Sequence, residues 1–249
     1  MTSLLATKLF PVPPRSQRVR RPHLVDRLTQ GLRPGHRLTI LAAPAGFGKT
    51  TLLGECLASA QRPVAWLSLD PSDNDPARFL SYVVAALQTL DATLGGDALR
   101  QLQGGESALS EPLLTSLLND LARSPCEGFL VLDDYHLIDH RPIHDAVAFV
   151  LDHLPSQWQI VMASRSDPPL PLSRWRARGE LTELRAADLR FTPAEAADFL
   201  NDVMGLSLSA ADIAVLETRT EGWIAGLQLA ALSMQGRPDV SDFIKSCAG

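Results

Sequence analysis

Hydrophobic residues along the chain follow two alternating patterns. Short runs that are apolar at almost every position are typical of strands buried on both faces of a parallel sheet, and longer segments with apolar residues every three or four positions are typical of helices. The expected strands are 37–43, 63–69, 128–132 and 158–164, with 181–184 as a candidate last strand. The expected helices are 23–31, 49–60, 76–90, 111–123 and 142–154. This alternation predicts a doubly wound parallel α/β sheet.

Other stretches depart from this alternation. Residues 2–22 are rich in proline and are predicted to form an extended lead-in, and residues 91–106 contain four glycines and are interpreted as a surface excursion. After Thr192 the strand pattern ends, and Thr192-Pro193-Ala194-Glu195 forms a capping box that starts a helical stretch. The helices expected there are 193–204, 209–219 and 223–234. We therefore predict three parts, namely a basic lead-in with a short helix (1–36), an α/β core (37–190) and a helical subdomain (191–249).

The composition restricts the class of protein. The chain has 23 Lys and Arg against 28 Asp and Glu, a net charge of −5, and 45% of its residues are hydrophobic. These values are typical of a packed globular protein and exclude wholesale disorder. No apolar run approaches the roughly 18–20 residues of a membrane span, so no membrane partner is expected. Three widely spaced cysteines without a preceding signal peptide predict a reduced, cytoplasmic setting.

A glycine-rich segment joins the first expected strand to the helix that follows it. Residues 43–51 (APAGFGKTT) fit the phosphate-loop pattern GxxxxGK(S/T) except at the first position, where Ala43 replaces glycine. Gly46 and Gly48 allow several backbone N–H groups to point at one phosphate. Lys49 would reach the β- and γ-phosphates, and the Thr50 hydroxyl would hold Mg²⁺. The other predicted nucleotide-binding positions of this loop are Ala45, Phe47 and Thr51. The alternative is a strand-to-helix turn without a ligand.

Acidic residues follow the apolar strand GFLVL at 128–132. Asp133 is the candidate Walker B acid on the Mg²⁺ side, and Asp134 is a candidate general base for an attacking water. The alternative for Asp134 is a solvated helix cap. Arg165 follows the next strand and is placed to sense the γ-phosphate, with an ordinary surface arginine as the alternative.

Two further groups of residues carry less weight. Residues 1–37 hold eight Lys and Arg but only one acid. Their prolines disfavour an organellar transit peptide, and the lack of interleaved aromatics disfavours a nucleic-acid grip. Residues 19–24, which include Arg21, are instead a candidate to fold over a nucleotide base. His136, His140 and His144 recur every four residues, but Pro142 indicates that a new helix begins between them, so no dedicated metal site is expected.

Several longer motifs carry a family resemblance over nearly the whole chain. They are LLATKLFPVP, VRRPHLVDRL, APAGFGKTTLL, WLSLDPSDNDPARFLSYVVAAL, LVLDDYHLI, MASRSDPPLPLSRWRARGELTELRAADLRFTPAEAADFL and TEGWIAGLQLAALSM. In these motifs the sequence resembles the large ATP-dependent LuxR-type transcriptional activators, or MalT-like regulators, of the STAND class of P-loop NTPases. The resemblance implies that Lys49 and Thr50 bind phosphate and Mg²⁺, that Asp133 and Asp134 are the Walker B acid and its catalytic neighbour, and that Arg165 is the sensor arginine.

The same resemblance implies how the C-terminal part is used. Related STAND proteins place a helical subdomain over the base, and Glu221-Gly222-Trp223 resembles the start of the corresponding helix, although the proline of several sister families is absent. Trp223 itself is interpreted as a core residue, with a contact to the base as the alternative. Similar proteins continue with a winged helix, a superhelical sensor and a C-terminal DNA-binding helix-turn-helix. Residues 241–249 resemble the entry to the winged helix, so DNA contact is expected only through a domain absent from these 249 residues.

The expected function is therefore a switch that binds ATP or ADP with Mg²⁺. Family members associate with themselves in the ATP state and are reset by slow hydrolysis, and the resemblance implies the same here. The first alternative is a turnover enzyme, either an ATPase or a small-molecule kinase, although no arginine-rich substrate lid is found. The second is a truncated remnant without function. The intact set Lys49, Thr50, Asp133 and Asp134 disfavours decay of the site.

Overall fold

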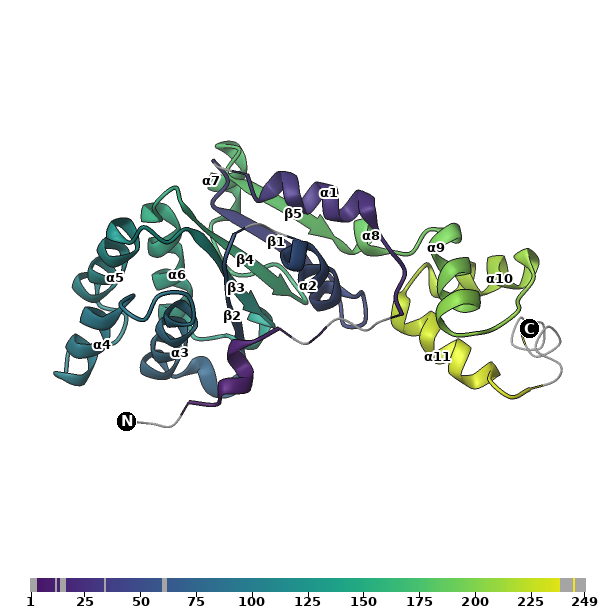
Figure 1. Cartoon of the computed structure of the whole chain (residues 1–249), viewed down its shortest axis with the longest axis horizontal. Helices are drawn as coiled ribbons and strands as arrows, with labels where there is room; N and C mark the ends of the chain where they lie inside the picture. Colours follow the sequence, from purple (N-terminus) through teal and green to yellow (C-terminus); the bar gives the residue numbers. More distant parts are fainter. Residues whose placement is uncertain are drawn as a thin grey trace.

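A five-stranded parallel sheet forms the centre of the protein. The structure is a computed structural model that describes residues 4–11, 13, 17–33, 35–59, 62–237 and 244. The strand order is β2-β3-β4-β1-β5, and every neighbouring pair is parallel (Figure 1). The strands are β1 (Leu38–Ala42), β2 (Val64–Ser68), β3 (Gly128–Asp133), β4 (Trp158–Ser164) and β5 (Leu181–Arg185). The predicted doubly wound α/β fold is confirmed, and so are all five expected strands.

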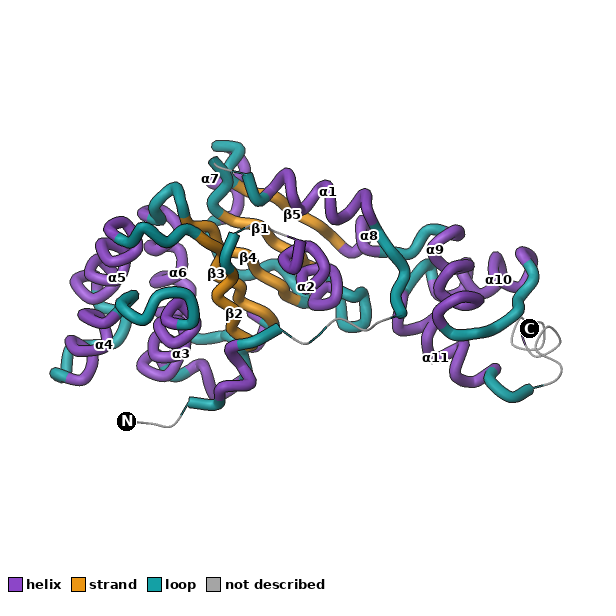
Figure 2. The backbone as a smooth tube through the Cα atoms, in the orientation of Figure 1, coloured by secondary structure: helices purple, strands orange, loops and turns teal. Residues whose placement is uncertain are grey.

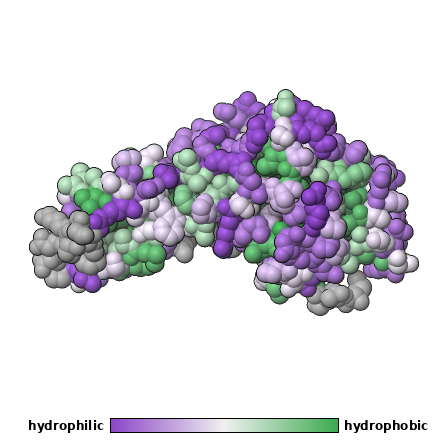
Figure 3. All heavy atoms as spheres, turned by 180° about the vertical axis from the view of Figure 1, so that it is seen from behind, coloured by the Kyte–Doolittle hydropathy of each residue, from purple (hydrophilic) through white to green (hydrophobic). Residues whose placement is uncertain are grey.

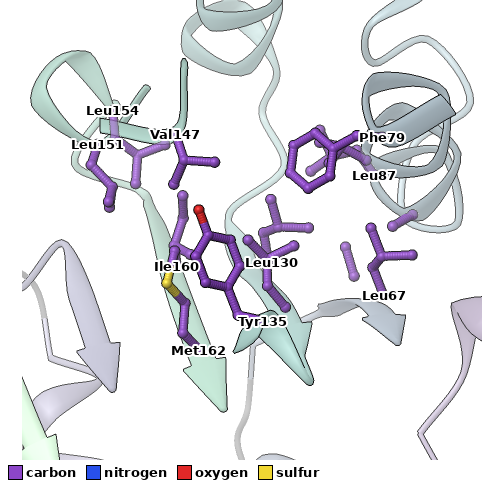
Figure 4. Packing of buried hydrophobic residues seen from close by; sticks show 14 of the residues in the cluster. Leu67, Phe79, Leu87, Leu130, Tyr135, Val147, Leu151, Leu154, Ile160 and Met162 are labelled. Carbon is purple, nitrogen blue, oxygen red and sulfur yellow. The ribbon is translucent and has the colours of Figure 1, made fainter. Parts of the chain in front are cut away.

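Helices cover both faces of the sheet, as Figures 1 and 2 show. On one face α3 (Pro76–Gln88), α5 (Glu111–Arg123) and α6 (Arg141–His153) pack in the largest hydrophobic cluster, part of which is seen in Figure 4. On the other face α1 (Pro22–Gly31) and α2 (Lys49–Ser59) form a second cluster. Successive strand residues point to opposite faces. In β1, Ile40 therefore belongs to the first cluster and its neighbour Leu41 to the second, which explains why the strand is apolar throughout.

The predicted surface excursion at residues 91–106 is wrong. It contains α4 (Gly96–Gln103), which packs on α5, and it buries Leu94 and Ala98 in the first cluster. The four glycines lie at the ends of this short helix and not in its interior, with Gly95 at its N-cap in a left-handed conformation (φ +68°) and Gly104 at its C-cap. Glycines at helix ends are compatible with a helix, whereas their number in the sequence obscured the short periodic segment. Two other short helices, α7 (Leu172–Ala177) and α8 (Ala186–Leu189), were also not predicted.

The three α-helices that the structure describes after α8 share a cluster of buried side chains of their own. They are α9 (Pro193–Ala197), α10 (Ala210–Thr220) and α11 (Ile224–Met234), which together are called the helical lobe. The predicted capping box is present, because Thr192 Oγ1 accepts from the Glu195 N–H at 3.2 Å and Glu195 accepts from the Thr192 N–H at 2.8 Å. The single helix expected at 193–204 is instead α9 followed by a π-helical turn, Asp198–Val203. The expected winged-helix entry lies outside the described residues, except for Ile244.

The lead-in is attached to the rest of the protein at several points. A 3₁₀ turn, Ala6–Leu9, interrupts the extended conformation that was expected, and buried Lys8 donates hydrogen bonds from it to Asp70, at 3.0 Å, and to the fully buried Asp73. Further along, Arg18 pairs with Glu55 of α2 at 3.4 Å. Val19 then packs against the cluster of the helical lobe. The lead-in therefore connects the edge of the sheet, the first helix after β1 and the helical lobe.

The outer surface of the protein carries both hydrophilic and hydrophobic side chains. Seen from behind, hydrophilic side chains cover much of the molecule, and the hydrophobic ones form separate patches (Figure 3). Of the helices that the structure describes, none is both long enough and apolar enough to cross a membrane.

Candidate functional site

The glycine-rich loop lies at the carboxyl end of β1. It follows Ala42 and leads directly into α2, which begins at Lys49. Gly46 and Gly48 have φ values of +81° and +74°, a left-handed conformation that favours glycine. Because the first turn of a helix has N–H groups without partners in the helix, and these carry its positive dipole end, the loop and α2 together form a site suited to a phosphate group.

The Lys49 side chain folds back over this loop. Its Nζ donates hydrogen bonds to the carbonyl oxygens of Ala43, at 2.6 Å, and Pro44, at 3.0 Å. Burial lowers the pKa of Lys49, the charges of Asp134 and Asp133 act in the opposite direction, and the net shift is downward. The ammonium group is thus held beside the loop by neutral carbonyls, which a more strongly accepting phosphate oxygen can replace.

Thr50 and Asp133 form the second half of the site. Thr50 Oγ1 donates to Asp133 Oδ2 at 3.0 Å, and Asp133 is only 4% exposed. Burial and the neighbouring charge of Asp134 raise the pKa of Asp133, and this outweighs the hydrogen bonds from Thr50 and from the Asp134 N–H. A buried carboxylate beside a hydroxyl group is the oxygen donor set that Mg²⁺ prefers, and a divalent cation would supply the positive charge that this carboxylate lacks.

Asp134 and Arg165 lie at the same edge of the sheet. Asp134 adopts a left-handed conformation (φ 57°, ψ 36°) directly after β3, and its side chain is 48% exposed. A non-glycine residue in this region is often found at functional sites, although aspartate tolerates it better than most. Exposed Arg165 follows β4, and its charge acts on Lys49 and on His136. The structure therefore brings Lys49, Thr50, Asp133, Asp134 and Arg165 together.

The helical lobe contacts the glycine-rich loop directly. Trp223 Nε1 donates to the Ala45 carbonyl at 2.9 Å, and the Ala225 N–H donates to the Gly46 carbonyl at 3.1 Å. Trp223 is 37% exposed, so its interpretation as a core residue is wrong. An open pocket of about 330 Å³ lies beside this contact. It is lined by Pro44, Ala45, Phe47, Arg190, Arg219, Thr220, Glu221 and Trp223.

Arg21 is engaged elsewhere. Its side chain is buried, and its guanidinium group donates to Glu195 at 2.9 Å and to the carbonyls of Leu189, at 2.9 Å, and Arg190, at 2.6 Å. Burial alone would raise the pKa of Glu195, but the hydrogen bonds and charge of Arg21 hold it below its ordinary value. Arg21 therefore fastens α1 to the helical lobe, and its role in nucleotide binding stays a prediction.

Sequence reasoning missed the residues that brace the turn after Asp134. Asn74 Oδ1 accepts from the N–H groups of Asp139 and His140 at 2.8 and 3.0 Å, and its Nδ2 donates to the Leu137 carbonyl at 2.8 Å. The sequence signal that could have identified Asn74 is the polar cluster DPSDND, which follows the second strand.

The three histidines that recur every four residues are not gathered at one site. Of these, His144 bonds through Nδ1 to the Tyr135 hydroxyl at 2.9 Å. Within the described ranges, no group of three or more His, Cys, Asp or Glu residues could hold a metal ion.

Replacing Gly46 by alanine is expected to separate α11 from the loop. A Cβ at Gly46 would lie 2.4 Å from the Cβ of Ala225 and 2.8 Å from Trp223 Nε1, which is closer than real Cβ contacts. The left-handed φ adds about 1–2 kcal/mol of backbone strain. Hydrogen exchange at the Ala225 amide measures the effect, because that N–H donates to the Gly46 carbonyl, and the exchange is expected to become faster.

Gly179→Ala is the matched control. Gly179 also has a left-handed φ (+70°), but nothing lies within 4 Å of a Cβ placed there. This variant carries the backbone strain without the collision and is expected to leave the Ala225 amide as protected as in the wild type. Equal exchange rates at Ala225 in both variants would contradict the steric argument.

The curated proteins that match include a protein kinase and a transcriptional regulator, and no family model matches. The chain is 36% identical over 247 residues to the serine/threonine-protein kinase PknK of Mycobacterium tuberculosis, which covers 98% of the chain and 22% of that protein. It is 38% identical over 198 residues to the HTH-type transcriptional regulator MalT of Yersinia enterocolitica, which covers 80% of the chain and 22% of the regulator. The chain thus spans about a fifth of the length of these relatives.

Solved structures agree on the fold. A signal transduction ATPase with numerous domains (STAND) and a tetratricopeptide repeat sensor, from Pyrococcus horikoshii, matches 95% of this chain and 33% of its own length with a TM-score of 0.60 and 15% identity. A Walker-type ATPase of Pyrococcus abyssi matches 97% of this chain and 75% of its own length with a TM-score of 0.55 and 18% identity. At these identities the likeness shows the fold, which is that of the P-loop ATPases.

Proposed function

Because the chain belongs to the MalT-like family of regulators and has the fold of a P-loop ATPase, we propose that it is a switch module that binds ATP or ADP with Mg²⁺ and hydrolyses ATP slowly. The observation that supports this most strongly is the pairing of Thr50 with the buried Asp133 beside Lys49 and the glycine-rich loop. These residues supply, in one place, donors for phosphate oxygens and oxygen ligands for a divalent cation.

Each residue has a separate role in this proposal. The N–H groups of residues 45–51 and the ammonium group of Lys49 bind the phosphates, and Thr50 and Asp133 hold Mg²⁺, which neutralises phosphate charge when bound. Asp134 accepts a proton from the attacking water through its half-exposed carboxylate. Arg165 responds to the γ-phosphate, because its charge lies close enough to act on Lys49.

Slow hydrolysis and a regulatory role form one part of the proposal. The lobe residues Trp223 and Ala225 donate hydrogen bonds to loop carbonyls. A change in the loop conformation on nucleotide exchange would therefore alter these bonds and the position of the helical lobe. A structure with two arrangements of such a contact can report which nucleotide is bound. Self-association in the ATP state belongs to the same proposal, and DNA would be contacted only through a further domain of the longer relatives.

A single-turnover assay with labelled ATP tests the proposal. The purified chain in excess is mixed with ATP and Mg²⁺, and bound ATP and ADP are followed over time, with EDTA in a parallel sample. We expect tight binding, slow conversion and retained ADP, and we expect EDTA to abolish conversion and weaken binding. Rapid conversion with prompt release of ADP would instead identify a turnover enzyme, and absence of binding with Mg²⁺ would identify a remnant without function.

A further inference from the structure

Ser68 is the last residue of β2 and lies beside Asp133, the last residue of β3. The two strands are neighbours in the sheet (Figure 1), and Ser68 and Asp133 are direct partners in their parallel register. The Leu69 N–H extends this pairing by donating to the Asp133 carbonyl at 3.0 Å. Since neighbouring strands are about 4.8 Å apart, two such side chains lie next to each other when they point to the same face of the sheet.

The Ser68 side chain points to the face of the sheet that α2 covers. Side chains alternate between the two faces along a strand. Trp66 belongs to the cluster on the α2 face, so Ser68, two residues further along β2, points to that face as well. Asp133 follows Val131 of the same cluster at the same spacing, and its hydrogen bond from Thr50 of α2 confirms this direction. The Ser68 hydroxyl and the Asp133 carboxylate therefore lie on the side from which Thr50 reaches the candidate cation site.

A buried tryptophan holds the Ser68 hydroxyl in place. Trp66 is 1% exposed, and its Nε1 donates to Ser68 Oγ at 2.9 Å. This bond occupies one of the two acceptor positions of the hydroxyl oxygen. The Ser68 side chain makes no other hydrogen bond with the part of the chain that the structure describes. One acceptor position of a firmly held oxygen is therefore left for another group.

The unused acceptor position suits a water molecule bound to a divalent cation. Mg²⁺ usually keeps several waters when one or two protein side chains bind it. The oxygen of such a water faces the cation, so the water donates hydrogen bonds to its surroundings, and a hydroxyl oxygen can accept one. Ser68 does not bond to Asp133 directly, and polar groups that lie side by side without a direct bond are commonly bridged by water.

We propose that Ser68 is a further residue of the divalent-cation site, where its Oγ accepts a hydrogen bond from a water molecule carried by a cation on Thr50 and Asp133. Trp66 is the positioning residue, because its indole N–H fixes the direction of the remaining acceptor position. The inference rests on the proposed binding of nucleotide with Mg²⁺. It extends the site from the glycine-rich loop, α2 and β3 to β2.

The dependence of ADP affinity on free Mg²⁺ tests this inference. The Kd for ADP is measured by competition with a fluorescent ATP analogue over a series of free Mg²⁺ concentrations and in EDTA. We expect Ser68→Ala to need about tenfold more Mg²⁺ for the same gain in affinity, because outer-shell partners typically contribute about 10–100-fold to metal affinity. Its Kd in EDTA should be unchanged. Ser68→Thr keeps a hydroxyl group and should stay within about threefold of the wild type.

Further variants separate the hydroxyl group from the packing around it. Ser68→Ala leaves the buried indole N–H without a partner, which costs about 1–3 kcal/mol. The double variant Trp66→Phe/Ser68→Ala removes donor and acceptor together and should show the same shift of about tenfold, whereas Trp66→Phe alone should stay within about threefold. Ser72→Ala changes an exposed serine of the following turn and should behave as the wild type. Thermal unfolding shows whether each variant is folded, and the double variant replaces Ser68→Ala if the latter is not.

A second measurement needs no nucleotide. Mn²⁺ is paramagnetic and broadens the NMR resonances of nearby nuclei, so the chain is titrated with Mn²⁺ alone while the indole N–H resonances are followed. The Trp66 resonance is expected to broaden at lower Mn²⁺ concentration than those of Trp158 and Trp175, which belong to the cluster on the opposite face of the sheet. In Ser68→Ala this broadening should require about tenfold more Mn²⁺.

The outcomes distinguish this inference from the proposed function. A wild-type chain that binds no nucleotide, with or without Mg²⁺, contradicts the proposed function, and the Mn²⁺ titration still decides the inference. Nucleotide binding with the same Mg²⁺ dependence in the wild type, Ser68→Ala and the double variant contradicts the inference alone and shows that Ser68 only pairs with the indole N–H. An equal loss of affinity in EDTA and in Mg²⁺ would indicate a packing role and also overturn it. Simultaneous broadening of the three indole resonances would overturn it as well.

Discussion

Replacing Lys49 by alanine is expected to weaken ATP binding about 100-fold or more while the chain remains folded. Lys49 Nζ contacts two loop carbonyls, at 2.6 and 3.0 Å, at the start of α2, where a γ-phosphate would be bound. Hydrogen bonds to charged groups contribute about 1.5–3 kcal/mol each, and 1.4 kcal/mol corresponds to a tenfold change in Kd. Pro44 is exposed and its carbonyl can bond to water, whereas the buried Ala43 carbonyl loses its partner, so loss of the ammonium group should cost about 1–3 kcal/mol of stability.

Equilibrium titration with a fluorescent ATP analogue and with unlabelled ATP in competition measures this effect. Lys49→Arg is the first control and should retain part of the affinity, because it keeps the charge but not the compact ammonium group. Arg178→Ala is the second control, since Arg178 is exposed at the end of α7 and should leave the Kd unchanged. A Kd for Lys49→Ala within threefold of the wild-type value would contradict the assignment of Lys49 to the phosphate site.

Replacing Asp134 by asparagine is expected to slow ATP hydrolysis about 10²–10⁴-fold while ATP still binds. This range is the typical contribution of a positioned general base, and asparagine keeps the size of the side chain but cannot accept the proton from water. Asp133, and not Asp134, accepts the hydrogen bond from Thr50, so the predicted Mg²⁺ ligands are not altered. The variant should therefore hold bound ATP for much longer than the wild type does.

Single-turnover kinetics and the Kd for ATP must both be measured, because only their combination separates catalysis from binding. Asp139→Asn is the matched control, since Asp139 is exposed and lies only five residues further along the same connection between β3 and α6. It should hydrolyse ATP at the wild-type rate. Hydrolysis by Asp134→Asn at the wild-type rate would show that another group takes the proton, and a large loss of affinity would show that Asp134 acts in binding instead.

The glycine-rich loop, which binds the nucleotide in both predictions, also contacts the helical lobe. The loop carbonyls of Ala45 and Gly46 accept hydrogen bonds from the beginning of α11, and Arg21 joins α1 to Glu195 in α9. The lobe is therefore fastened both to the loop and to the lead-in. Breaking a buried ion pair by removing one partner typically costs about 3–5 kcal/mol. We therefore expect the Arg21–Glu195 pair to stay intact when the contact between the lobe and the loop changes.

Much of the sheet could be predicted because its signal is local. A strand covered on both faces must be apolar at nearly every position, and the segments around Ile40 and Leu130 meet this condition without help from the rest of the chain. The helix α4 was missed for the opposite reason. It is eight residues long with glycines at both ends, and its position depends on packing against α5. A short segment of this kind has no strong periodicity before its partner is present.

The sequence by itself determined the kind of fold and the residue types at the phosphate loop. The period of the hydrophobic positions, the spacing of the Gly-Lys-Thr motif and the acid after an apolar strand are all properties of residues that are close together in the sequence. Only the tertiary structure decided which distant residues meet there. Strand order places β4 beside β1 and β3 beside β4, and so carries Arg165 and Asp133 to the end of the sheet where the loop lies. The lobe brings Trp223 onto Ala45 across 178 positions of sequence. The position of Ser68 beside Asp133 is likewise visible only in three dimensions, since the register between two strands that are far apart in the sequence is set by packing between elements and not by spacing along the chain.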